Sequence, residues 1–200
     1  MIICTDGHGL TGPINRQATP TTKLERSVPV TQTFIYNMTK GNNIRIALLV
    51  GHRHLITTIA GFLHDEWRSF PPWASISAIE DRMAEGLRLN GTTFTLVALS
   101  DENDFMGTAG IKRFELPGHH DKEHWLSEVF IPKRLRGQGI GSALISDCIG
   151  RSEDLGIQAL YLYTPDRQKL YQRFGWHQIE QTFVNNESVS IMVRHTMHNL

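Results

Sequence analysis

The stretch RLRGQGIGSAL at residues 134–144 combines residue types that bind anions. Gly137, Gly139 and Gly141 alternate there between two arginines and an apolar run. Glycine at this density is destabilising unless a ligand must approach the backbone or a residue needs a positive φ. A glycine turn that leads from a strand into a helix also gathers free backbone N–H groups at the positive end of the helix dipole. The stretch therefore predicts a phosphate-binding turn.

Two familiar phosphate-binding turns do not fit the spacing. A P-loop requires a lysine after the last glycine, and Ser142 follows Gly141 here. A dinucleotide-binding fingerprint requires a third glycine at the position of Ser142, and it belongs early in a βαβ unit. A purely structural glycine turn, with its arginines on the surface, remains the alternative.

The elements around this turn follow from the apolar periodicity, in the order β-α-α-β-β-β-α-β-α-β-β. A hairpin is expected at DEND, residues 101–104, and another at Asn185 and Asn186. The run ALYLYT is predicted to be a strand buried on both faces. The expected strands cover 44–52, 92–101, 104–115, 124–132, 159–164, 176–184 and 188–195, and the expected helices cover 53–67, 75–87, 140–156 and 167–175.

Residues 1–43 differ from the rest of the chain in composition. They are rich in Thr, Pro, Gly and Asn and hold no sustained period, which predicts a flexible arm before a domain over 44–200. Within the arm, TQTFIYNM at 31–38 could pair as a strand.

The composition excludes several classes of protein. Twenty basic residues balance twenty acidic ones in 200 residues, so no overall charge attracts nucleic acid or an anionic membrane. No apolar run approaches the roughly 20 residues that span a bilayer, and no signal peptide is visible. Cys4 and Cys148 lie far apart, which suits a reducing compartment, so we expect a cytoplasmic protein.

Arg136, Gly139 and Gly141 match the Arg/Gln-x-x-Gly-x-Gly/Ala motif of the GNAT superfamily, the acyl-CoA-dependent N-acetyltransferases. The sequence resembles this family over 44–196, and LYLYTPDRQKLYQRFGW at 160–176 adds a second motif where the family requires it. The resemblance implies an α/β fold, with a mixed and mostly antiparallel central sheet flanked by helices. It also implies that acetyl-CoA is the acyl donor.

The resemblance implies a cofactor site on the glycine turn and on the strand before it. The turn would wrap the CoA pyrophosphate, and the free edge of the strand would pair with the pantetheine arm, with an N–H near Ile131 polarising the thioester carbonyl. Thr164 replaces the asparagine of many members, and Asp166 is expected to cap the next helix. The cofactor-binding residues implied are Val129, Phe130, Ile131, Arg134, Arg136, Gly137, Gln138, Gly139, Ile140, Gly141, Ser142, Thr164, Asp166 and Tyr171.

Two residues are expected to move protons in the transfer. Tyr171 aligns with the tyrosine that donates a proton to the leaving sulfur, although a tyrosine there could also be packed in the core. Glu128 could serve as the base, or it could be a solvated or ion-paired carboxylate. Strict alternation places Ser127 on the opposite face of the strand from Glu128, so only one of them could face the cleft.

The acceptor is expected to be a primary amine of a small molecule or a peptide, and a homodimer is left open. Asp65 and Glu66 could attract the amine and Trp73 could wall it in, although the acids could equally form a solvated helix end. His119 and His120 could line the acceptor mouth, with a plain exposed loop as the alternative. No metal is expected, because no further Cys or His pair complements HHDKEH.

Two other functions remain open at this stage. The domain could bind acyl-CoA as a sensor without catalysis, and the presence of Tyr171 argues against that. A nucleotide-binding protein could use the same loop, and ATP or NAD would then stabilise it where CoA would not.

Overall fold

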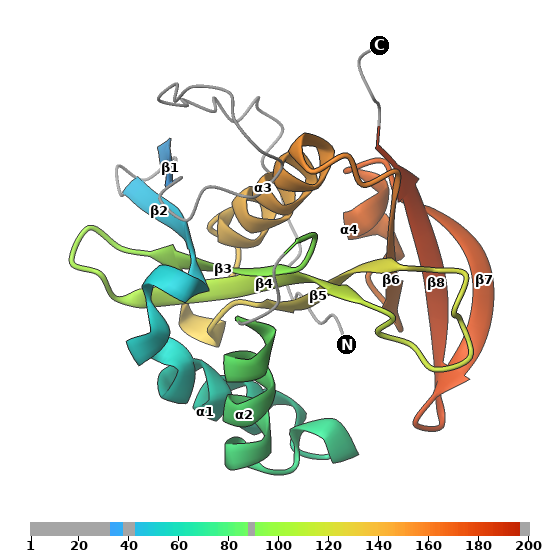
Figure 1. Ribbon diagram of the computed structural model, residues 1–200, viewed down its shortest axis with the longest axis horizontal. Coiled ribbons are helices and arrows are strands. Elements are labelled where there is room, and N and C mark those ends of the chain that lie inside the picture. The colour runs from blue at the N-terminus through green and yellow to red at the C-terminus, as the bar shows by residue number, and fades with distance from the viewer. Residues whose placement is uncertain (1–32, 38–42, 88–90, 197–200) are drawn as a thin grey trace.

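The computed structural model describes residues 33–37, 43–87 and 91–196. Its centre is an eight-stranded sheet in the order β1-β2-β3-β4-β5-β6-β8-β7 (Figure 1). Every neighbouring pair is antiparallel except β5 and β6, so the predicted mixed and mostly antiparallel sheet is confirmed. The strands are β1 (Phe34–Asn37), β2 (Asn43–Leu48), β3 (Phe94–Leu99), β4 (Phe105–Arg113), β5 (His124–Phe130), β6 (Ala159–Thr164), β7 (His177–Val184) and β8 (Glu187–His195).

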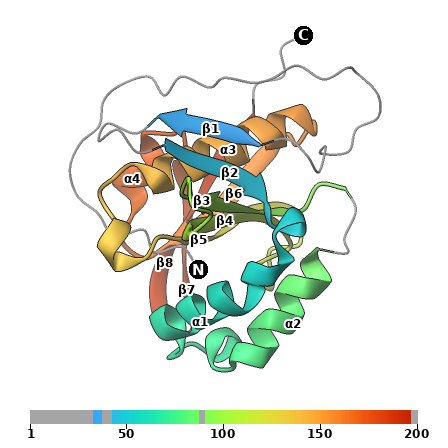
Figure 2. The same cartoon turned by 90° about the vertical axis from the view of Figure 1, so that its left-hand side faces the viewer.

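Helices cover both faces of the sheet. In Figures 1 and 2, α1 and α2 lie on one face, whereas α3 and α4 lie on the other. Short 3₁₀ turns connect several elements, including Pro71–Trp73 before α2 and Lys133–Leu135 before α3. Ser75 caps α2, because its side chain accepts a hydrogen bond from the N–H of Ala78. The α-helices are α1 (Ile56–Trp67), α2 (Ile76–Gly86), α3 (Ile140–Asp154) and α4 (Gln168–Gln172).

Each face of the sheet has its own apolar core. On the α3 side, Ile140 and Leu144 of the helix pack with Val129 and Ile131 of β5. On the α1 side, residues of α1 and α2 pack around Phe130. The burial of apolar surface on both faces is the main term that stabilises such a layered domain.

The parallel pair β5–β6 is open over most of its length. Its only paired residues in the described chain are Trp125 and Tyr161, whereas β6 pairs with β8 from Ala159 to Thr164. Beyond Trp125 the two strands therefore diverge, which leaves this edge of β5 free, as the resemblance implied. We call the space between them the β5–β6 gap.

A bulge in β5 lies beside this gap. Glu128 has a φ of 54°, and the pairing of β4 with β5 shifts between Thr108 and Gly110. Leu126 and Val129 both pack in the core on the α3 side, although strict alternation would put them on opposite faces. The expectation that Ser127 and Glu128 face opposite sides is therefore wrong, because the bulge places both on the α1 side.

One sequence possibility is confirmed, and one expectation needs correction. The strand β1 pairs with β2 and buries Tyr36, so the segment TQTFIYNM at 31–38 does supply a strand, while residues 1–32 and 38–42 lie outside the described part of the chain. In β6, Leu160 and Leu162 are buried whereas Tyr161 and Tyr163 are only half-buried. This strand is therefore not buried equally on both faces, since one face looks toward a cavity.

Candidate functional site

The glycine turn before α3 has the backbone geometry of an anion site. Gly137 and Gly139 have φ values of 74° and 86°, which glycine adopts without strain. Gly139 is the N-cap of α3, and no side chain caps the helix. Ala143 donates to the carbonyl of Gly139 at 3.0 Å. From Gly137 to Ser142, no backbone N–H bonds to another backbone group of the described chain, so these donors are available to a phosphate.

The two arginines of the turn have different surroundings. Arg136 donates through Nε to the carbonyl of Ile131 at 2.9 Å and through Nη2 to Glu66 Oε1 at 2.8 Å. Arg134 is exposed, and only its carbonyl is bonded, to the side chain of Gln138. Arg134 is thus the guanidinium at the turn that no described acid neutralises, whereas Arg136 joins the turn to α1.

The ion pair with Arg136 also changes the role expected of Glu66. Its carboxylate is half-buried and points to the turn, and Glu66 does not line the cavity described below. Asp65 is exposed and lies outside the cavity as well. The expectation that these two acids attract the amine is therefore not supported by their positions.

Tyr171 lies on the α3 side of the sheet. It is fully buried in the same apolar core as Ile131 and Ile140, and its ring meets that of Trp176 edge-on at 6.0 Å. Trp176 is itself held by a 3.1 Å hydrogen bond from its indole N–H to the carbonyl of Leu160 on β6. Tyr171 is thus fixed close to the strands that border the gap and to the start of α3.

The cap of α4 differs from the prediction. Thr164 Oγ1 accepts a 3.1 Å hydrogen bond from the backbone N–H of Arg167. Asp166 is exposed and pairs with the side chain of Arg167 instead. Since the N-cap of α4 is Arg167, with no side-chain cap, Asp166 does not cap this helix. The buried hydroxyl of Thr164 orders the turn in its place.

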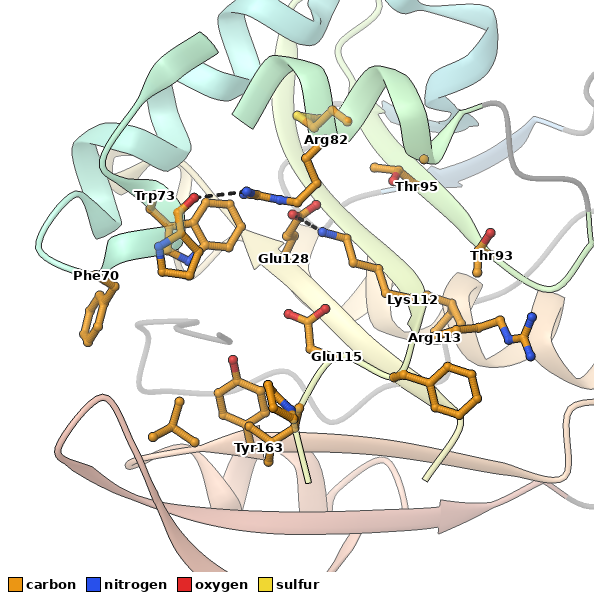
Figure 3. Close-up of a pocket in the computed structure, with 18 of the residues that line it drawn as sticks. Phe70, Trp73, Arg82, Thr93, Thr95, Lys112, Arg113, Glu115, Glu128 and Tyr163 are labelled. Carbon is orange, nitrogen blue, oxygen red and sulfur yellow. Dashed lines mark hydrogen bonds and ion pairs between the residues drawn. The ribbon is translucent and has the colours of Figure 1, made fainter. Parts of the chain in front are cut away.

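A cavity of about 700 Å³ opens on the α1 side of the sheet, against the β7–β8 hairpin (Figure 3). Its walls come from α2, the turn before it, β3, β4, β5, β6 and the hairpin. Of the acceptor residues predicted from the sequence, only Trp73 lines it. The lining residues labelled in Figure 3 are Phe70, Trp73, Arg82, Thr93, Thr95, Lys112, Arg113, Glu115, Glu128 and Tyr163.

Glu128 sits at the inner wall of this cavity. Its side chain is 1% exposed, and Oε1 forms an ion pair with Lys112 of β4. Oε2 is buried and has no hydrogen-bond partner among the described residues. One carboxylate oxygen therefore stays able to accept a proton or a hydrogen bond from a bound molecule. Glu128 is thus ion-paired, as one alternative held, and its role as the base stays a prediction.

Two more ionisable groups face the cavity beside Glu128. Burial alone would raise the pKa of Glu115, but the charge of Lys112, a 3.0 Å hydrogen bond from Ser127 and the charge of Arg82 lower the pKa overall. Burial, followed by the charges of Glu115 and Glu128, raises the pKa of Tyr163 well above its usual range. The cavity therefore holds Glu115 as an ionised carboxylate next to a phenol that stays protonated.

Arg82 closes the opposite wall of the cavity. Its Nη1 donates to the carbonyl of Pro72 at 3.0 Å, and its guanidinium lies 4.6 Å from the centre of the Trp73 ring. These two contacts fix the plane of the guanidinium at the cavity wall, where Figure 3 shows it near Lys112 and Glu128.

The predicted histidines lie outside the cavity. His119 contacts Glu180 of β7 at 3.0 Å through Nε2 and packs edge-on against Trp125, and His120 is exposed. Neither lines the cavity. Within the described ranges, no three metal-binding side chains are grouped closely enough to hold an ion. His119 thus joins the loop before β5 to the hairpin.

Sequence reasoning missed Arg82, Lys112, Glu115 and Tyr163. No short motif in the sequence contains them. They come together only in the fold, Arg82 from α2, Lys112 from β4, Glu115 from the segment after β4 and Tyr163 from β6. For Tyr163 a signal existed, since tyrosines alternate with leucines in ALYLYT and predict a face more polar than the other. For Arg82 no local pattern distinguishes it from an ordinary exposed arginine on a helix.

The fold agrees with comparisons to known proteins. The model of the acetyltransferase (GNAT) family matches residues 59–176, which include the glycine turn and Tyr171. No curated protein matches the chain significantly. Among the described residues, no helix is both long and apolar enough to cross a membrane.

Three solved structures illustrate the structural likeness. A chimera of the spermidine N-acetyltransferase SpeG from Vibrio cholerae and hSSAT is 17% identical, with a TM-score of 0.58, over 76% of this chain and 95% of its own. A putative phosphinothricin N-acetyltransferase is 18% identical, with a TM-score of 0.60, over 78% and 99%. Aminoglycoside 6'-acetyltransferase type Ii is 15% identical, with a TM-score of 0.61, over 78% and 99%. At these identities the likeness establishes the fold.

Proposed function

Because the chain belongs to the GNAT acetyltransferase family, we propose that it transfers an acetyl group from acetyl-CoA to a primary amine by direct attack. The observation that carries the proposal is the β5–β6 gap, where the two strands pair only at Trp125 and Tyr161. The glycine turn lies at one end of this opening, and the cavity with Glu128 lies on the α1 side of it.

The chain's own residues suit the binding of acetyl-CoA. The free N–H groups from Gly137 to Ser142 would hold its pyrophosphate, with Arg134 adding a charge-assisted contact. Arg136 would keep the turn in place through Ile131 and Glu66. The open edge of β5 from Val129 to Ile131 would pair with the pantetheine arm, since the other edge is already bonded to β4.

The two proton transfers would take place on opposite faces of the sheet. When bound, the cofactor supplies an acetyl group activated as a thioester. An alkylammonium, with a pKa of about 10, must lose a proton before its nitrogen can attack. Glu128 would take this proton on the cavity side, through its free Oε2. Tyr171, on the α3 side, would give a proton to the leaving sulfur.

This arrangement keeps the acid and the base apart. Tyr171 lies in the apolar core on the α3 side and Glu128 lies in the wall of the cavity on the α1 side, so each would serve its own proton transfer. Tyr163 faces the cavity as a protonated phenol and would donate a hydrogen bond to the bound acceptor. The names of the solved neighbours include acceptors as different as spermidine and phosphinothricin, so family membership alone leaves the acceptor open.

Two measurements test the proposal on the full chain. Thermal unfolding is followed with acetyl-CoA, CoA, ATP and NAD, each titrated over the same concentrations. Ligand at about 100 Kd adds about 2.7 kcal/mol to the free energy of unfolding, so selective stabilisation by acetyl-CoA and CoA is expected. Thiol release with a panel of amines then tests turnover. CoA binding without turnover of any amine would favour the non-catalytic sensor, and stabilisation by ATP or NAD alone would refute the proposal.

A further inference from the structure

The cavity contains two charged groups that no described residue fully satisfies. Arg82 Nη2 and Glu128 Oε2 are both buried from solvent, and neither has a hydrogen-bond partner in the described part of the chain. A buried polar atom without a partner is costly, and in a cavity wall it marks the place where a ligand atom would bind. Arg82 Nη2 is a donor on a cation and would bind an anionic group. Glu128 Oε2 is an acceptor on an anion and would bind a cationic group.

Arg82 is held in place by other bonds. Pro72 accepts from Nη1 at 3.0 Å, and the indole of Trp73 supports the guanidinium from one side at 4.6 Å. No acid of the described ranges lies within ion-pair distance of Arg82, although its charge acts on Glu115 in the same cavity, whereas Lys112 is paired directly with Glu128. Arg82 is therefore a fixed cation with a free donor, presented from α2 into the cavity.

A guanidinium in this state selects a planar anion. Its rigid N–H groups match the two oxygens of a carboxylate, and stacking on an aromatic ring keeps water from one face of the cation. A second ammonium group, as in a polyamine, would meet a like charge at this position and would be disfavoured. Figure 3 shows Arg82 and Glu128 converging on the same space from α2 and β5.

We propose that the acceptor is a small primary amine that also carries a carboxylate, as in an α-amino acid. Its carboxylate binds Arg82 over Trp73, and its amine lies at Glu128 Oε2, where it loses its proton. This assignment rests on the proposed acetyl transfer and adds the chemical class of the acceptor. The side chain of the amino acid would extend toward Phe70 and Tyr163 at the cavity wall.

The first test compares matched acceptors with the wild-type chain, by thiol release from acetyl-CoA. Leucine, methionine and phenylalanine are each compared with their carboxamide and with their decarboxylated amine, and spermidine serves as the polyamine. The free amino acid of at least one set is expected to exceed its amide and its amine in kcat/KM by roughly 10- to 100-fold, the range for one lost charge-assisted hydrogen bond.

The second test changes Arg82. Arg82→Gln should lower kcat/KM for the amino acid by roughly 10- to 100-fold and leave the value for its amide unchanged, because only the carboxylate contact is lost. Arg82→Lys keeps the charge without the planar fork and should show a smaller loss. Arg68→Gln, at an exposed arginine after α1, is the matched control. Stabilisation of each variant by CoA verifies that it is folded.

The outcomes separate the two levels of the proposal. If amides, decarboxylated amines or spermidine are acetylated as well as the amino acids, or if Arg82→Gln lowers all acceptors equally, the acceptor class is overturned while acetyl transfer stands. If no acceptor releases thiol although CoA binds, acetyl transfer fails and the acceptor class fails with it.

Discussion

Replacing Lys112 by methionine removes the cation that neutralises Glu128 and retains most of the apolar length of the side chain. Glu128 is 1% exposed and Lys112 is 25% exposed, so the variant leaves a carboxylate in the wall of the cavity without its cation. Breaking a buried ion pair in this way destabilises a protein by about 3–5 kcal/mol. Because Lys112 is partly exposed and the cavity admits water, we expect about 2–3 kcal/mol here.

This destabilisation is large enough to measure in two ways. For a chain of this size it corresponds to a fall in Tm of roughly 4–12 °C. Urea unfolding, followed by the fluorescence of the four tryptophans, gives the free energy directly. The cycle of Lys112→Met, Glu128→Gln and the double variant then isolates the pairwise coupling, which we expect to exceed about 1 kcal/mol. The double variant should be more stable than Lys112→Met alone, since it no longer buries an unpaired charge.

A second ion pair nearby supplies the control. Arg113 and Glu123 lie 2.7 Å apart, but their side chains are 51% and 45% exposed. The same cycle on this pair should give a coupling below about 0.5 kcal/mol, because water screens exposed charges. Equal coupling for both pairs, or a Lys112→Met variant as stable as the wild type, would show that the carboxylate of Glu128 is not held by Lys112.

Three further predictions concern the turn, the acid and the cavity. Gly139→Val should lower stability by about 1–3 kcal/mol and abolish stabilisation by CoA, because φ is 86° there; Gly61→Val, whose new Cβ meets no atom within 4 Å, should keep it. Tyr171→Phe should lower kcat by roughly 100-fold while CoA affinity is retained, and full activity would exclude the tyrosine as the acid. The lowered pKa of Glu115 contributes stability at neutral pH that is lost as the pH falls through that pKa; Glu115→Gln should therefore lose less stability than the wild type on acidification, as urea unfolding at several pH values would reveal.

The glycine turn was predictable because its information is local. Gly139 needs a positive φ, and the sequence around it contains every donor that the turn presents. The closing hairpin was predictable for the same reason, since Asn185 and Asn186 both adopt positive φ values of 50° and 63° in the turn. Turns of this kind depend on residues that are adjacent in the sequence, so the residue types at the turn are enough to predict them.

The cavity beside Glu128 was only partly predictable, because its charged residues come from segments that are far apart in the sequence. Glu66 was expected to bind the amine because its side chain is negatively charged. Its partner in the structure is instead Arg136, which is far from it in the sequence. Ser127 and Glu128 were expected on opposite faces, and the bulge at Glu128 reverses this. A bulge inserts one extra residue into the alternation of side chains between the two faces of a strand. No residue type in WLSEVF predicts a bulge at Glu128.

The single pairing between β5 and β6 divides the sheet into two plates, one of five strands and one of three. Side-chain packing beneath α3 joins the plates, while backbone hydrogen bonds contribute almost nothing at the seam. A molecule that forms hydrogen bonds along the open edge of β5 takes the place of a strand and links the two parts of the sheet. Amide hydrogen exchange should then slow on both sides of the seam at once, in Phe130 and Ile131 as well as in β6, although only one side carries the glycine turn. The gap proposed to admit acetyl-CoA is therefore also the place where the sheet has the fewest backbone hydrogen bonds, and a ligand bound there would stabilise both parts of the sheet together.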